Sequence, residues 1–327
     1  MEKKLLFSFL VPNYGYSNLL FDCFDSLVNQ RVDDNFDFEI VMCDQSDKED
    51  YEKIVNEFSK RYGDKVKIVY SEIKGSLRAR HNLMNYAKGD YIAFIDSDDF
   101  VDLDYLSVLY RKIKENDFPD VFITSYILCN YDGKDDPRLY TPFECEQSQI
   151  MDYFIYSYQF NEIVRKIFKR ELYQGIEGAD LDIKNCDDWT MTFPIMLRAK
   201  TIVYDKSVQK YHYRINQNSL THKFTKADTL KNFGVHERYL KDLSPNEFQK
   251  NLFNTQLIRM YLVNCDVLTK NKDFTKEDFK EVTDLLSSRL YELKENNLSK
   301  KHKLLYLLLR KHAYGRLRLI FKIRKVL

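Results

Sequence analysis

The chain has little of what secreted and membrane-spanning proteins are built from. Its six cysteines show no paired spacing, which argues against a disulfide framework or a structural zinc site and favours a reducing cytosol. No apolar run approaches the roughly 20 residues that a membrane-spanning helix needs. The run Leu5–Val11 is short, and Pro12 follows it without a small-residue cleavage site. We therefore expect a first β-strand there rather than a secretory signal.

Glycine is also scarce, with nine residues in 327. The turn that follows the first predicted strand, residues 12–18, contains one glycine and lacks the Gly-x-Gly-x-x-Gly pattern. That pattern brings the backbone against a dinucleotide pyrophosphate, so its absence argues against NAD. A mononucleotide held by its base and by metal-bound phosphates remains open.

What is present indicates a globular protein with an unevenly distributed charge. Hydrophobic residues make up 44% and aromatic residues 15% of the chain. The length suggests two domains, or one large domain with an appendage. The formal net charge is +1, but ten of the 51 Lys and Arg residues lie in residues 300–327, which contain no acid. The chain therefore reads as an acidic body with a basic tail.

Apolar segments of strand length alternate with helical patterns along the first 130 residues. This alternation predicts an α/β fold with a mostly parallel, doubly wound sheet. The expected strands are Leu5–Val11, Phe38–Cys43, Val66–Tyr70, Tyr91–Ile95 and Val121–Leu128.

The strand expected at Tyr91–Ile95 runs directly into a cluster of acids: Asp96, Asp98, Asp99, Asp102 and Asp104. Carboxylates this dense repel one another unless a cation lies among them. The carboxyl ends of the strands in an open α/β sheet form the ligand crevice, and oxygen ligands suit Mg²⁺ or Mn²⁺. The alternative is an acidic turn that caps a helix from Leu103 onward. We expect Asp102 to be such a cap, and Asp96 and Asp98 to serve a metal.

These segments, in this order, resemble family 2 glycosyltransferases of the GT-A fold. The resemblance covers about residues 5–130 and resumes near residues 186–189 and 211–214. Cys43 stands where the family usually has a first acid, which leaves Asp44 alone to contact a base. The matching segments are Val11–Tyr14, Ile40–Ser46, Arg80 with Ala87–Tyr91, Phe94–Asp99, Cys186–Trp189 and Tyr211–Arg214.

The resemblance implies a set of site residues. An aromatic face such as Tyr14 stacks on a base for about 1–3 kcal/mol, and a carboxylate such as Asp44 accepts a hydrogen bond from its edge. The alternatives are a core-edge aromatic for Tyr14, a helix cap for Asp44 and a surface position on a helix for Arg80. The implied nucleotide-binding residues are Pro12, Tyr14, Asp44, Arg80, Asp96 and Ser97. The implied ligands of Mn²⁺ or Mg²⁺ are Asp98, Asp96 and Asp99, with either His212 or His222 as a further candidate.

The resemblance also assigns catalytic and acceptor residues. Asp188 is the expected general base, with Asp187 beside it, although acids at a helix N-terminus are also stabilised by the helix dipole. Arg214, Lys166 and Trp189 are expected near phosphate or acceptor. For Lys166 a solvated charge run, and for Trp189 a place in the core, are the alternatives. The irregular segment 131–149 is expected to border the acceptor.

The remainder of the chain is expected to be helical, with helix starts at Ser244 and Thr275, where an oxygen-bearing cap is followed by an acid three residues on. We predict a nucleotide-sugar-binding and catalytic domain at 1–223, a helical region at 224–299 and a basic amphipathic tail at 300–327. On a single helix the tail places Leu305, Leu309, Arg316 and Leu319 on one stripe, with most of its cations opposite. This pattern favours binding to an anionic membrane surface over a docked helix or nucleic-acid binding. The expected location is therefore cytoplasmic, peripheral on the inner face of the plasma membrane.

The implied activity is inverting transfer of a sugar from a nucleotide diphosphate, by default UDP, to an acceptor hydroxyl. A membrane-associated tail suggests a lipid-linked glycan acceptor in polysaccharide biosynthesis. Two other functions remain open. One is a non-catalytic scaffold that binds nucleotide sugars, and the other is a glycoside hydrolase, which needs two carboxylates at a set separation.

Overall fold

The protein is described by a computed structural model, which divides into two compact units. The first comprises residues 1–150, 160–182 and 187–217, and the second comprises 151–159, 183–186 and 218–327. The structure describes residues 4–130, 132–134, 144–157, 160–173, 187–215, 275–287 and 313–323, with a few single residues between 227 and 311.

The first unit is built on a seven-stranded sheet with the order β3-β2-β1-β4-β8-β6-β9. All neighbouring pairs are parallel except those of β8, which runs antiparallel to both β4 and β6. The predicted α/β fold with a mostly parallel sheet is confirmed. Its strands are β1 (Leu5–Asn13), β2 (Phe36–Asp44), β3 (Val66–Tyr70), β4 (Tyr91–Phe94), β6 (Val121–Thr124), β8 (Lys166–Lys169) and β9 (Ile202–Asp205).

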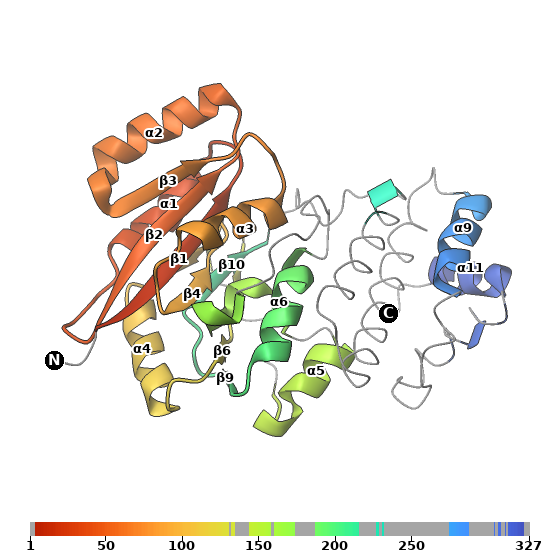
Figure 1. The fold of residues 1–327 in the computed structure, drawn as a ribbon. Coiled ribbons are helices and arrows are strands. Elements are labelled where there is room, and N and C mark those ends of the chain that lie inside the picture. The colour runs from red at the N-terminus through yellow and green to blue at the C-terminus, as the bar shows by residue number, and fades with distance from the viewer. Residues whose placement is uncertain are drawn as a thin grey trace. The chain divides into compact units, whose positions relative to one another are not determined.

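Helices between these strands lie against the sheet (Figure 1). Leu20, Phe24 and Leu27 of α1 are all fully buried, and the Phe24 ring meets Phe58 of α2 at 4.7 Å. On a helix such spacing gathers apolar groups on one face, which the sheet and the neighbouring helix then cover. The helices are α1 (Asn18–Val28), α2 (Lys48–Tyr62), α3 (Ser76–Tyr86), α4 (Tyr105–Glu115) and α6 (Asp187–Arg198).

A second, three-stranded sheet brings distant segments beside the acidic strand end. It has the order β5-β10-β7, with β5 (Phe100–Val101), β7 (Ile127–Cys129) and β10 (Tyr211–Arg214). The single strand predicted at Val121–Leu128 is wrong, because β6 and β7 lie in different sheets. The Ser125 N–H bonds to Val208 O between them. An apolar run without alternation does not reveal where a chain leaves one sheet for another.

The helix cap predicted at Asp102 is also wrong. Helix α4 begins at Tyr105, and Asp104 occupies the N-cap position. The Asp102 carboxylate instead contacts Lys210 Nζ at 2.9 Å and His212 Nε2 at 2.8 Å. The partners of the Asp102 carboxylate thus come from a distant part of the chain, just before and within β10. The sequence near Asp102 does not indicate them.

The described helices of the second unit are α9 (Lys276–Ser287) and α11 (Tyr314–Ile323), and α5 (Ile150–Ser157) starts at the boundary between the units. The predicted helix start at Thr275 is confirmed. Thr275 N–H donates to the Asp278 carboxylate at 2.9 Å, and Asp278 N–H donates to the Thr275 hydroxyl at 3.1 Å. The helix start predicted at Ser244 lies outside the described residues.

The basic tail is not one continuous helix. Lys311 lies in a turn, Ala313 is outside any helix, and α11 begins at Tyr314. Leu317 is fully buried, whereas Leu319, which the single-helix pattern placed on the apolar stripe, is 56% exposed. No helix in the described part of the chain is long and apolar enough to span a membrane.

Candidate active site

The acidic segment after β4, Asp96–Asp99, is anchored by one buried carboxylate. Asp99 is 1% exposed, Tyr211 OH donates to its Oδ2 at 2.6 Å, and Arg214 N–H donates to its Oδ1 at 2.8 Å. The Asp96 N–H in turn donates to the Tyr211 hydroxyl at 3.2 Å. Burial, together with the charges of Asp96 and Asp98, raises the pKa of Asp99 well above its ordinary value. Asp99 is thus an internal anchor of the segment, and its prediction as a metal ligand does not fit this placement.

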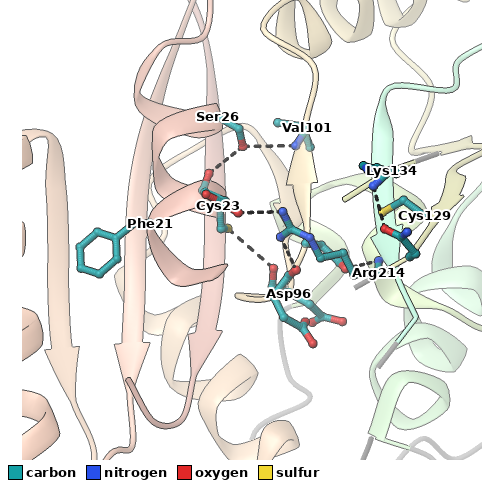
Figure 2. Close-up of polar contacts among 12 residues, drawn as sticks. Phe21, Cys23, Ser26, Asp96, Val101, Cys129, Lys134 and Arg214 are labelled. Atoms are coloured by element: carbon teal, nitrogen blue, oxygen red, sulfur yellow. Dashed lines mark hydrogen bonds and ion pairs between the residues drawn. The ribbon is translucent and has the colours of Figure 1, made fainter. Parts of the chain in front are cut away.

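The Arg214 side chain binds the backbone of the same segment. Its Nη1 donates to the Asp98 carbonyl oxygen at 2.7 Å, and its Nη2 donates to Asp22 Oδ2 on α1 at 2.9 Å. Its guanidinium also lies over the Phe100 ring, 4.6 Å from the centroid. Figure 2 shows Arg214 between α1 and the acidic segment, close to Asp96. Arg214, predicted near phosphate or acceptor, thus has protein partners at both terminal nitrogens.

Arg80 on α3 connects the acidic segment to the start of α6. Its side chain is 5% exposed, and its Nη2 lies 2.9 Å from Asp96 Oδ1. Its Nη1 lies 3.2 Å from Asp188 Oδ1 and also bonds to Asp187 Oδ2. The structure thus brings together three acids that the sequence places in two separate motifs. Arg80, predicted to contact nucleotide, lies buried among them.

Asp188 has the environment of a carboxylate that exchanges protons near neutral pH. It lies in the first turn of α6, and its side chain is 36% exposed. Loss of hydration, together with the charges of Asp187 and Asp96, raises the pKa of Asp188 to about 7 against the lowering effect of Arg80. A general base works best when its pKa lies near the operating pH.

Two other predicted acceptor residues lie in the interior. Lys166 is fully buried, and its Nζ donates to the Glu162 carbonyl at 2.7 Å and to the Phe160 carbonyl. Burial lowers the pKa of Lys166 to about 7, so the solvated charge run considered for it is wrong. Trp189 is buried too, with its ring 4.8 Å from that of Phe193. Its placement matches the core alternative rather than an open acceptor surface.

An exposed aromatic ring follows the end of β1. Tyr14 is 61% exposed, and Lys74 Nζ lies 3.1 Å from its hydroxyl and 4.8 Å from the ring centroid. Tyr14 is therefore not a core-edge aromatic. Pro12 lies within β1, and Ser97 is half-buried between the acids of the β4 end.

Asp44 is fully buried behind this turn, at the end of β2. It accepts hydrogen bonds from Asn13 Nδ2 at 2.6 Å and from the Ser46 N–H and hydroxyl, each at 3.0 Å. It does not cap α2, whose N-cap residue is Asp47. Its carboxylate ties the ends of β1 and β2 together, which sequence reasoning missed. The Asp-x-Ser spacing, typical of a local side-chain-to-backbone turn, is the signal that could have shown it.

The histidines proposed for the metal are either engaged elsewhere or not described. His212 Nε2 lies 2.8 Å from Asp102 Oδ1, and its ring stacks on Phe100 at 4.3 Å. His222 lies outside the described residues, as do most of the segment 131–149 and residues 174–186, which precede the Asp187–Asp188 pair.

The carboxylates at the end of β4 could supply only part of the coordination shell of a metal ion. Among the described residues, no group of three or more His, Cys, Asp or Glu could hold a metal ion. Asp96 and Asp98 remain at the strand end once Asp99 is buried, and Asp96 is shared with Arg80. Mg²⁺ is commonly bound by one or two carboxylates, completed by water and substrate phosphates. The acidic strand end fits that arrangement.

Comparison with known proteins identifies the family of this chain. The model for glycosyl transferase family 2 matches residues 8–176, more than half of the chain. The chain belongs to this family.

Its relatives include bacterial glycosyltransferases. A Bacillus spizizenii poly(ribitol-phosphate) beta-glucosyltransferase is 30% identical over 63% of this chain and 32% of its own length. The glycosyltransferase GlyG of Streptococcus pneumoniae is 26% identical over 64% of this chain and 71% of its own length. The chain thus spans about a third of the first of these relatives.

A solved structure shares the fold. The Staphylococcus aureus TarS fragment 1–349, in complex with UDP-GlcNAc, superposes with a TM-score of 0.74 over 97% of this chain and 91% of that one. The two sequences are 16% identical, so this likeness concerns the GT-A fold.

Proposed function

We propose that this glycosyltransferase moves a sugar from a nucleotide diphosphate to an acceptor hydroxyl by a single inverting displacement. One observation carries the proposal. Arg80 brings Asp188, whose pKa is raised to about 7, together with the carboxylate of Asp96 at the end of β4. A proton acceptor and an acidic strand end are then neighbours, as displacement of a diphosphate from an anomeric carbon requires.

In this reaction Asp188 takes the proton of the acceptor hydroxyl. The acceptor oxygen forms a bond to the anomeric carbon as the bond from that carbon to the diphosphate oxygen breaks. The nucleoside diphosphate leaves with the electron pair. A positioned base of this kind contributes roughly 10²–10⁴-fold to the rate. Attack from the face opposite the leaving group inverts the anomeric centre.

Asp98, with Asp96 assisting, would hold Mn²⁺ or Mg²⁺ against the diphosphate. When bound, a divalent cation would neutralise the charge that develops on the departing group. The protein's own contribution is to fix the backbone that carries the two carboxylates. Tyr211 and Arg214 contact that backbone, at the Asp96 N–H and the Asp98 carbonyl.

UDP is the proposed nucleotide, and a lipid-linked glycan is the proposed acceptor. The exposed Tyr14 ring at the end of β1 offers a stacking surface for the base. The fold shared with a protein that was crystallised with UDP-GlcNAc supports this donor class. The names of the bacterial relatives support an acceptor from polysaccharide biosynthesis. The basic tail 300–327, with Leu319 exposed, is proposed to bind the anionic inner membrane surface.

A thermal-shift screen with Mn²⁺ and a panel of nucleotide sugars tests the donor. A specific donor raises the melting temperature by mass action, because it binds only the folded protein. The preferred donor is then followed for release of nucleoside diphosphate with a polysaccharide-type acceptor. The Asp188→Asn protein, which keeps the side-chain shape, is the matched control. Equal stabilisation by every nucleotide sugar, or equal release by the variant, would contradict the proposal.

A further inference from the structure

One guanidinium group lies between the two acidic motifs of the site. Arg80 Nη2 contacts Asp96 Oδ1 at 2.9 Å on one side. Arg80 Nη1 contacts Asp188 Oδ1 at 3.2 Å and Asp187 Oδ2 on the other. A guanidinium is planar and presents its donors at fixed angles, so acids bound to its two ends cannot move independently.

Loss of the Arg80 cation would leave the surrounding carboxylates without a nearby opposite charge. Arg80 is 5% exposed, and the three carboxylates around it are 21% to 36% exposed. Their attraction outweighs burial and raises the pKa of Arg80. Without the cation, three partly buried carboxylates would face one another with no opposite charge between them. Such a cluster separates or takes up protons.

The scaffold around Arg80 restricts where the guanidinium can go. Helix α3 begins just after Gly75, and the Gly75 N–H donates to Gln45 Oε1 at 2.9 Å at the end of β2. Helix α3 also packs on β1, β2 and α6. The position of Arg80 is therefore set by the central sheet and is transmitted to α6 through its contacts with Asp187 and Asp188.

From this geometry we infer that Arg80 is a positioning residue for the base. It holds the Asp188 carboxylate at a set place relative to the donor-side acid Asp96, so that proton removal and departure of the diphosphate occur in one geometry. The inference rests on the proposed function, since it takes Asp188 as the base. Both terminal nitrogens of Arg80 are already bound to protein carboxylates, which separates this role from direct binding of the nucleotide.

The test replaces the planar group but keeps its charge. Arg80→Lys retains one cation, which cannot reach both sets of acids in the same directions. We expect kcat to fall by about 10²-fold, the size of effect that a small misplacement of a catalytic group produces. Donor affinity, measured by calorimetry with UDP and Mn²⁺, should stay near the wild-type value. Arg78→Lys, on the same helix, is the matched control and should leave both quantities unchanged.

A double-mutant cycle separates action through Asp188 from an independent effect. In the Asp188→Asn background, Arg80→Lys should cost little further activity, because the group that it positions is already disabled. A full additional loss in the double variant would overturn the inference. So would weaker UDP binding that accounts for the whole loss of activity, because Arg80 would then be a donor ligand.

The same variants can be judged without any turnover. Crystal structures of the wild type and of Arg80→Lys should show the Asp188 carboxylate displaced in the variant. An unmoved carboxylate would overturn the inference even if no sugar transfer is ever measured, whereas failure of the proposed function would appear as an inactive wild type. If Arg80→Lys does not fold, Arg80→Gln, which keeps a planar donor group, takes its place in each measurement.

Discussion

Tyr211 donates a 2.6 Å hydrogen bond to Oδ2 of Asp99, although 112 positions separate the two residues. The same hydroxyl accepts the Asp96 N–H, so one phenol fixes both ends of the acidic segment. Both side chains are buried, and burial raises the pKa of Tyr211 well above its ordinary value. The hydroxyl therefore stays protonated, as its role as donor to Asp99 requires.

Tyr211→Phe should destabilise the protein and loosen the acidic segment. The change removes a buried hydroxyl and leaves the Asp99 oxygen and the Asp96 N–H without that partner. An unsatisfied buried group costs about 1–3 kcal/mol. Urea unfolding measures the loss, and UDP calorimetry with Mn²⁺ measures the effect on the site. Tyr213→Phe, on the same strand, is the control, and equal stability of the two variants would contradict the prediction.

Asp98→Ala should abolish cation-dependent UDP binding and leave the fold intact. The variant loses a proposed metal ligand and relieves repulsion within the acidic segment. Calorimetry with UDP, with and without Mn²⁺, is the measurement. Asp104→Ala removes a nearby acid that pairs with Lys210 at 3.0 Å, and it should bind like the wild type. Undiminished Mn²⁺-dependent transfer by Asp98→Ala would rule out the metal assignment.

The rate of transfer should rise with pH through about 7, where Asp188 loses its proton. The protonated carboxyl group cannot take up the proton of the acceptor hydroxyl. The rate of transfer should therefore fall on the acidic side of this pKa and be level above it. Single-turnover transfer at saturating donor measures the profile. Asp188→Asn should lower the rate by roughly 10²–10⁴-fold and remove this acidic limb. An unchanged limb in the variant would place the base elsewhere.

Gly89→Ala should destabilise the first unit by overpacking. A Cβ built at Gly89 would lie 2.6 Å from the Ser8 backbone nitrogen and 2.9 Å from the Phe7 carbonyl carbon. Backbone atoms must move to admit it, at a cost of about 1–3 kcal/mol. The control is Gly315→Ala in α11, where nothing lies within 4 Å of the added atom. Thermal unfolding compares the two, and a smaller loss at Gly89 than at Gly315 would refute the argument.

Deleting residues 300–327 should release the protein from anionic vesicles and leave transfer to a soluble acceptor largely intact. Binding of the full chain should weaken with salt, because surface charges are screened within about 10 Å at 0.1 M. Sedimentation with vesicles of anionic or neutral lipid measures both effects. Equal sedimentation of the full and shortened chains would argue decisively against a membrane role for the tail.

The sequence by itself determined the architecture, and it predicted where the chemistry should lie. Apolar segments of strand length, alternating with helical patterns, were enough to predict the parallel sheet, because burial on both faces leaves a local imprint on each strand. The acids after Phe94 could be expected at the carboxyl edge of the sheet, because they directly follow a buried strand, and open α/β sheets bind ligands at that edge. The Thr275 helix start also followed from neighbouring residues, since a capping box is a local interaction.

Only the tertiary structure decided which of the predicted groups reach the site. Asp98 and Asp99 are adjacent in sequence, yet a phenol from β10 makes Asp99 an internal anchor. From the sequence alone, Arg80 could be a surface residue on a helix. In the structure its side chain is buried against acids that follow β4 and begin α6. Charge type and spacing predict what a side chain can bind, but burial and partners depend on contacts between distant segments. Local sequence does not encode those contacts.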